Sequence, residues 1–173
     1  AQVFDSLRHS DGALVAATLS GLYRSEGEQS WERGYRPPAL SVAGSLADEA
    51  VLYAGVEAGI CTSGDSGRSW EFRAVPATDS FLVAAIAVSP AEGETLYLGT
   101  LSYTGERGEL YASRNGGETL RLLKTFEVPV NAVLVHPEKP STVYAGTGAF
   151  YAPGTPGGVY RSVDGGRSWT STR

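Results

Sequence analysis

Two nearly identical eight-residue stretches decide the fold of this chain. They read "SGDSGRSW" at residues 63–70 and "SVDGGRSW" at residues 162–169. An Asp-Gly or Asn-Gly step between two apolar runs is a strong signal for a tight β-turn, because one position needs a positive φ. The Asp carboxylate and the Ser hydroxyl can accept N–H groups within their own turn. The Trp that opens the next run offers a large apolar face to a neighbouring sheet. These stretches therefore predict hairpin turns with a structural role.

The same phrase recurs in weaker form at "SRNGGETL", residues 113–120, and at "SEGEQSW", residues 25–31. Counted at the first Ser of each phrase, the spacings are 38, 50 and 49 residues. Each unit also carries short alternating runs rich in Val, Tyr, Leu and Thr, separated by Gly, Pro and Asp. That pattern predicts four short strands a unit and no helix. A repeat of this length and strand content is typical of a propeller blade.

We therefore expect an all-β protein, a β-propeller or propeller segment of four four-stranded antiparallel blades. Residues 1–173 are taken as a single propeller segment. The expected blades cover about 1–38, 39–79, 80–128 and 129–173.

The two full phrases resemble the Asp-box (BNR) repeat, Ser-x-Asp-x-Gly-x-Ser/Thr-Trp, and the resemblance extends over essentially the whole chain. Similar repeats occur in sialidases, sortilin-type receptors, certain endoglucanases and photosystem II assembly-factor-like propellers. The resemblance implies that the box is a structural turn on the outer rim, away from the ligand site. The residues that carry it are Ser63, Asp65, Gly67, Trp70, Ser113, Asn115, Gly117, Ser162, Asp164, Gly166 and Trp169. Because these families share the box and little chemistry, the resemblance does not identify a reaction.

Loop lengths suggest where a ligand would bind. In a blade with strands A to D, the connections between B and C lie opposite the box turns. These B–C connections are minimal at residues 19–20 and 57–58 but longer at 101–107 and 148–156. Extra length on one face of a repeat array often marks the binding side. The aromatic and arginine residues of the two long loops predict a ligand-binding site at Tyr103, Arg107, Phe150 and Tyr151. The alternative is that these side chains pack over the blade tops.

The predicted function is a non-catalytic binding or assembly scaffold whose partner is a protein or a glycan. The alternative is a glycoside hydrolase propeller, sialidase-like or endoglucanase-like, or a fragment of one. A sialidase-like site needs an arginine cluster, a Tyr/Glu nucleophile pair and an acidic proton donor, and no local motif ties such residues together here. An endoglucanase-type site needs paired carboxylates across a cleft. Candidates are Glu57, Asp79, Glu106 and Glu109. Most carboxylates of this kind, however, are simply exposed to solvent and have no catalytic role. No nucleophile elbow, phosphate loop or dinucleotide fingerprint is present. The sequence thus indicates no enzyme and no catalytic residues.

Composition and charge limit the kinds of partner and ligand that we expect the chain to bind. A net charge of −5 provides no basic field for nucleic acid. No apolar run approaches the length of a membrane span. The single Cys61 is expected at a half-buried packing position, and no Cys/His set indicates a metal; no cofactor is expected.

Two further questions stay open at this point. Four blades fit a part of a larger propeller, a closed ring of four, or two copies that associate into a ring of eight. The start "AQVFDSL" lacks Met, which fits removal of a secretory signal and also trimming of the chain. The compartment is therefore undetermined, with a secreted or periplasmic location slightly favoured.

Overall fold

A computed structural model describes residues 2–25, 27, 30–45, 47–76, 81–90, 94–149 and 157–172. Within these residues, sixteen strands form four separate four-stranded antiparallel sheets. In each sheet the strands lie side by side in chain order, so every connection inside a sheet is a hairpin.

The first sheet consists of β1 (Val3–Arg8), β2 (Leu14–Thr18), β3 (Gly21–Ser25) and β4 (Trp31–Tyr35). The second consists of β5 (Ala39–Gly44), β6 (Leu52–Val56), β7 (Gly59–Ser63) and β8 (Glu71–Ala74). The third consists of β9 (Phe81–Val88), β10 (Leu96–Ser102), β11 (Gly108–Ser113) and β12 (Arg121–Phe126). The fourth consists of β13 (Val130–Val135), β14 (Val143–Thr147), β15 (Gly158–Ser162) and β16 (Thr170–Thr172).

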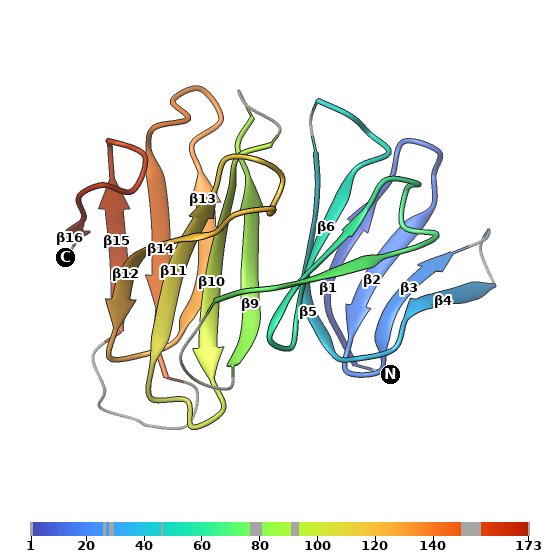
Figure 1. Ribbon diagram of the computed structural model, residues 1–173, viewed down its shortest axis with the longest axis horizontal. Coiled ribbons are helices and arrows are strands. Elements are labelled where there is room, and N and C mark those ends of the chain that lie inside the picture. Colours follow the sequence, from blue (N-terminus) through green and yellow to red (C-terminus); the bar gives the residue numbers. More distant parts are fainter. Residues whose placement is uncertain are drawn as a thin grey trace.

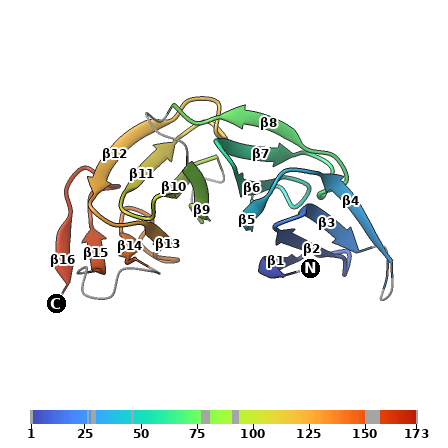
Figure 2. The same ribbon diagram turned by 90° about the horizontal axis from the view of Figure 1, so that it is seen from below.

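The sheets stand face to face around an arc, as the two ribbon views show (Figures 1 and 2). Strands β1, β5, β9 and β13 line the inside of the arc, and β4, β8, β12 and β16 lie along its outside (Figure 2). This arrangement confirms the all-β propeller segment of four four-stranded blades. The arc is open, with the first and fourth sheets at its two ends. The chain therefore does not close into a ring of four in this structure.

The apolar core lies between consecutive sheets, because each short sheet has too little apolar surface to form a core alone. Leu22 of the first sheet packs with Ala54, Val56 and Cys61 of the second. Cys61 is fully buried in this cluster, with no exposed surface. The expectation of a half-buried cysteine is thus wrong, because the preceding sheet covers the whole side chain.

Three turns, which we call the box turns (residues 63–70, 113–120 and 162–169), connect the third and fourth strands of the second, third and fourth sheets. Each is organised around its own side chains. In the first, the Ser63 hydroxyl donates to Asp65 Oδ1 at 2.8 Å and accepts from the Gly67 N–H at 2.9 Å. The Asp65 carboxylate accepts from the Ser69 N–H at 2.8 Å and from its hydroxyl at 2.6 Å. The aspartate is therefore used within its own turn.

The other two box turns repeat this pattern. Asp164 accepts from the Ser168 N–H at 2.9 Å and from its hydroxyl at 2.6 Å. Asn115 replaces the aspartate in the third sheet, and its Oδ1 still accepts from the Thr119 N–H at 2.9 Å. A single side-chain oxygen is therefore enough to close the turn.

The second glycine position of each box turn meets the preceding sheet. Gly67, Gly117 and Gly166 have φ values of 86°, 89° and 85°. A Cβ at Gly117 would also lie 2.4 Å from Cδ1 of Ile60 in the second sheet. Glycine is needed here both for its positive φ and for this close approach.

Candidate functional site

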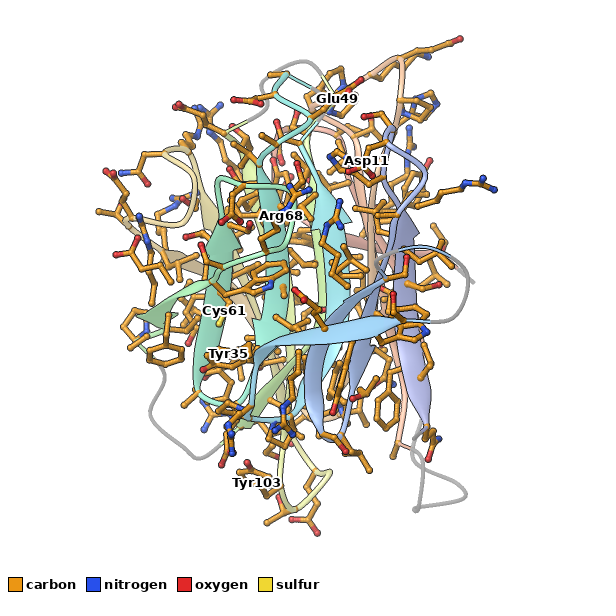
Figure 3. All side chains as sticks on the ribbon, turned by 90° about the vertical axis from the view of Figure 1, so that its right-hand side faces the viewer. Asp11, Tyr35, Glu49, Cys61, Arg68 and Tyr103 are labelled. Atoms are coloured by element: carbon orange, nitrogen blue, oxygen red, sulfur yellow. The ribbon has the colours of Figure 1, made fainter. Side chains whose placement is uncertain are left out.

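The two ends of the blades differ in what they carry. Tyr103 lies at one end, and Asp11 and Glu49 lie at the opposite end, with Arg68 of a box turn on their side of the molecule (Figure 3). We call the end that holds Tyr103 the B–C end, because it carries the turns between second and third strands at residues 19–20, 57–58 and 103–107. The B–C end thus lies opposite the box turns.

The turn of residues 103–107 is held by Ser102, the last residue of β10. The Ser102 N–H donates to the Arg107 carbonyl at 2.9 Å, and the Ser102 hydroxyl accepts from the Arg107 N–H at 3.2 Å. Gly105, with φ +72°, allows the chain to reverse. Tyr103 projects from this turn with 54% of its surface exposed. An aromatic ring is therefore displayed on a closed, hydrogen-bonded turn.

The carboxylate of Glu57, in the turn after β6 of the second blade, lies close enough to the Tyr103 hydroxyl to affect its pKa. Partial burial of the hydroxyl end, followed by this carboxylate, raises the pKa of Tyr103 to about 12. Glu57 lies in the tight turn after β6, where the next residue, Ala58, has φ +57° and donates its N–H to the Phe81 carbonyl at 3.0 Å. Through Glu57 and Ala58, this turn of the second blade therefore contacts the third blade at Tyr103 and Phe81.

Glu109 forms a second polar group of the same blade. It is 7% exposed. Its carboxylate accepts from Arg107 Nη2 at 3.0 Å and from the Tyr111 hydroxyl at 2.5 Å, and its N–H donates to Thr100 Oγ1 at 2.9 Å. Burial, followed by the hydrogen bond to Glu109, raises the pKa of Tyr111. The expectation of a solvated carboxylate is therefore wrong for Glu109, because the longer hairpin of the third blade buries it against these partners.

The half-buried Tyr35 lies beside the buried Cys61 (Figure 3). Burial raises the pKa of the Cys61 thiol to about 11, although the hydrogen bond to Tyr35 opposes this shift. Burial, then the Cys61 contact, then the Glu57 charge raise the pKa of Tyr35. Glu57 thus acts electrostatically on tyrosines from both neighbouring blades.

The structure places part of the predicted site together. Tyr103 and Arg107 share one turn, and the exposed Glu106 lies between them. Phe150, Tyr151 and Asp79 lie outside the described residues. Among the described residues, no group of three or more His, Cys, Asp or Glu side chains is arranged to hold a metal ion. In the described part of the chain no helix could cross a membrane.

Sequence reasoning missed the contact of Tyr103 with Glu57 and the buried role of Glu109. One signal for Glu109 was present. The fourth residue before the box Ser is glycine in three units, at Gly21, Gly59 and Gly158, but Glu109 in the third. A lone charged residue at a position otherwise held by glycine indicates a local change in structure.

Cavities also occur at the end opposite to Tyr103. One of about 260 Å³ lies between the third and fourth sheets, with Tyr97, Arg114, Ser141 and Arg167 in its lining. Another of about 410 Å³ lies between the first two sheets. His9 lines it and contacts the Glu49 carbonyl through Nε2 at 2.8 Å.

Comparison with known proteins supports the fold. No protein-family model matches the chain, and no curated protein matches it either. Among solved structures, a GH74 enzyme from Niastella koreensis is 20% identical over 99% of this chain, with a TM-score of 0.77. The GH74 xyloglucanase from Xanthomonas campestris is 20% identical over 98%, with a TM-score of 0.73. The extracellular domain of a hybrid two-component system from B. thetaiotaomicron is 14% identical over 98%, with a TM-score of 0.73.

These are propeller proteins, and at such identities the likeness shows the fold alone. This chain spans 29%, 30% and 22% of the length of those three chains, respectively.

Proposed function

We propose that this chain is a segment of an Asp-box propeller that binds carbohydrate, without catalysis, at its B–C end. The observation that carries the proposal is the exposed ring of Tyr103 on a closed, hydrogen-bonded turn, beside the carboxylate of Glu57 of the adjacent blade. An exposed tyrosine ring offers its apolar face to a sugar ring at a low cost in conformational entropy, because the side chain has only two rotatable χ angles.

Polar groups around this ring supply hydrogen-bonding capacity. The Arg107 guanidinium is oriented by the buried Glu109, and the exposed Glu106 and Glu57 lie in the same two turns. A few oriented polar groups beside an apolar surface are the usual composition of a small-ligand site. Because one of the structures with this fold is a xyloglucanase, xyloglucan is the first ligand to test.

Binding of the purified chain to xyloglucan oligosaccharides, other β-glucans and sialosides, measured by calorimetry, tests the proposal. Tyr103→Ser should abolish binding and leave the thermal unfolding midpoint unchanged, because the side chain is half exposed. Tyr103→Phe keeps the ring but loses the contact with Glu57, so it should bind more weakly than the parent. Equal affinity of all three proteins would contradict the proposal, as would binding of a protein partner alone.

A second candidate is a glycoside hydrolase, of which this chain would be a part. Two exposed carboxylates, Glu57 and Glu106, lie in adjacent turns at the end that carries Tyr103, and two of the similar structures are GH74 enzymes. Release of reducing ends from the same glycans distinguishes this candidate from the first. Hydrolysis that is lost in both Glu57→Gln and Glu106→Gln would favour the enzyme over the binding module.

A further inference from the structure

The interfaces between consecutive sheets repeat one arrangement. A tyrosine on the second strand of one sheet reaches the box turn of the next. The Tyr53 hydroxyl oxygen lies 3.4 Å from the position of a Cβ at Gly116, and the Tyr97 hydroxyl oxygen lies 3.6 Å from that at Gly165. Both tyrosines are 4% exposed. The following box turn therefore covers this side of each sheet.

The first interface uses an arginine at the same place. Arg24 on β3 donates from Nε to the carbonyl of Ser66, which holds the box position of Gly116 and Gly165, at 2.9 Å. Arg24 pairs in register with Val15 on β2, which is fully buried. Each sheet thus presents apolar residues and a hydrogen-bonding group to the next box turn.

The fourth sheet carries the same residues with nothing in the described structure against them. Tyr144 on β14 pairs with Leu134 on β13 as Tyr97 pairs with Ala87 on β9. Arg161 on β15 pairs with Tyr144 as Arg24 pairs with Val15. We call Leu134, Tyr144, Val159 and Arg161 the exit face.

Exposure distinguishes the exit face from its equivalents. Val159 pairs with Gly146 as Ile60 pairs with Gly55 and Leu110 with Gly99. Ile60 and Leu110 are fully buried, whereas Val159 is 46% exposed and Leu134 is 59% exposed. The exit face therefore presents apolar surface that the same positions bury in the sheets before it.

We propose that the exit face binds a four-stranded blade with a complete box turn of the kind found at residues 63–70. The partner's box turn would lie over Tyr144, as the next box turns lie over Tyr53 and Tyr97, and would offer a backbone carbonyl to Arg161. Its second and third strands would cover Val159 and Leu134. The proposal rests on continuity with the three interfaces that the chain already forms, and it is independent of the carbohydrate proposal.

The observations favour such a blade over the first sheet of a second copy. The face of the first sheet that is turned away from the second sheet also exposes apolar residues, with Leu14 at 40% and Trp31 at 47%. However, its turn, residues 25–31, is one residue shorter than the box turns and has no Asp. A second copy would therefore bring an incomplete turn to Tyr144 and Arg161.

An extended chain tests this directly. A second copy of residues 36–76, which contain the second blade and its link, is added after Arg173. Amide hydrogen exchange in β14 and β15 should slow by roughly tenfold relative to the parent chain, as expected when a face becomes covered. A second extension that carries residues 77–126, the third blade, should have the same effect. If neither extension slows exchange there, the proposal is overturned.

Charge substitutions test whether the exit face is the surface that the added blade covers. Val159→Asp should be nearly neutral in the parent chain but should reverse the slowed exchange in both extended chains. Val3→Asp is the matched control, because Val3 is 55% exposed on the first sheet and should change neither chain. An equal effect of Val159→Asp in parent and extended chains would contradict the proposal. Sedimentation equilibrium of the parent chain gives the remaining outcome: a dimer that Val159→Asp dissociates would show that a second copy, and not a further blade, occupies the face.

Discussion

The indole of Trp70 lies against the backbone of Gly34 in the preceding sheet, so closely that a Cβ at residue 34 would be 2.9 Å from the indole Cδ1. The indole Nε1 donates to the Gly67 carbonyl of its own turn at 3.1 Å. One side chain therefore fastens the box turn of the second blade and also fills the interface with the first. Trp169 repeats the bond to its own turn, to Gly166, at 3.1 Å.

Replacement of Trp70 should destabilise the chain strongly. Trp70→Ala removes the apolar contact between two sheets, and we expect the free energy of unfolding to fall by about 3 kcal/mol. Trp31→Ala is the matched control, because Trp31 is 47% exposed and no sheet of the described structure covers it. Urea denaturation of the three proteins measures both effects. Equal losses for the two substitutions would show that the contact between sheets is not what Trp70 contributes.

The box aspartates should make stability depend on pH in acid. Burial alone would raise the pKa of Asp65, but the Ser69 hydroxyl and N–H and the Ser63 hydroxyl outweigh it and lower the pKa to about 2. Because this value is below the roughly 3.9 of an unfolded Asp, the contribution of Asp65 is complete above about pH 4 and is lost as the pH falls through 2.

Asp65→Asn provides the comparison for this prediction, since Asn115 already closes the equivalent turn in the third blade. The difference in urea midpoint between the parent and Asp65→Asn should shrink as the pH is lowered from about 5 to about 2. Hydrogen bonds from Ser168 also lower the pKa of Asp164. The difference in urea midpoint between the parent and Asp164→Asn should therefore also shrink as the pH is lowered. A difference that is constant over this range would refute the assignment.

Cys61 should be chemically inert while the chain is folded. Its side chain is fully buried, and burial raises its pKa to about 11, so little thiolate forms near neutral pH. Mass spectrometry after treatment with iodoacetamide should show no modification of the native chain and complete modification in denaturant. Rapid labelling of the native protein would mean that the first two sheets separate readily.

Glu109 should be required for the structure of the long hairpin. Glu109→Ala removes the carboxylate that accepts from the Tyr111 hydroxyl and from Arg107 Nη2, and we expect a loss of about 2 kcal/mol in the free energy of unfolding. Glu106→Ala, in the same turn but exposed, should cost little. Thermal unfolding followed by circular dichroism measures the two variants. A neutral Glu109→Ala would show that water replaces these contacts.

Much of the architecture was predictable because it depends on local chemistry. Alternating apolar runs, glycines and the repeated Ser-Asp-Gly-Ser-Trp phrase determine strands and turns over a few residues, and a fourfold repetition makes the pattern unambiguous. The site was only partly predictable. The length of their loop predicted Tyr103 and Arg107 as candidates, but Glu57, nominated for a different chemistry, lies beside Tyr103 from 46 residues away in the chain.

The sequence by itself thus determined the blade, since strand alternation and turn chemistry act between neighbours in the chain. The tertiary structure decided what the blades do to one another: the complete burial of Cys61, the withdrawal of Glu109 from solvent, and the exposure of Val159 where Ile60 and Leu110 are covered. The physical reason is that burial depends on which sheet lies opposite a side chain, and equivalent positions in a repeat meet different neighbours at the middle and at the ends of an open arc.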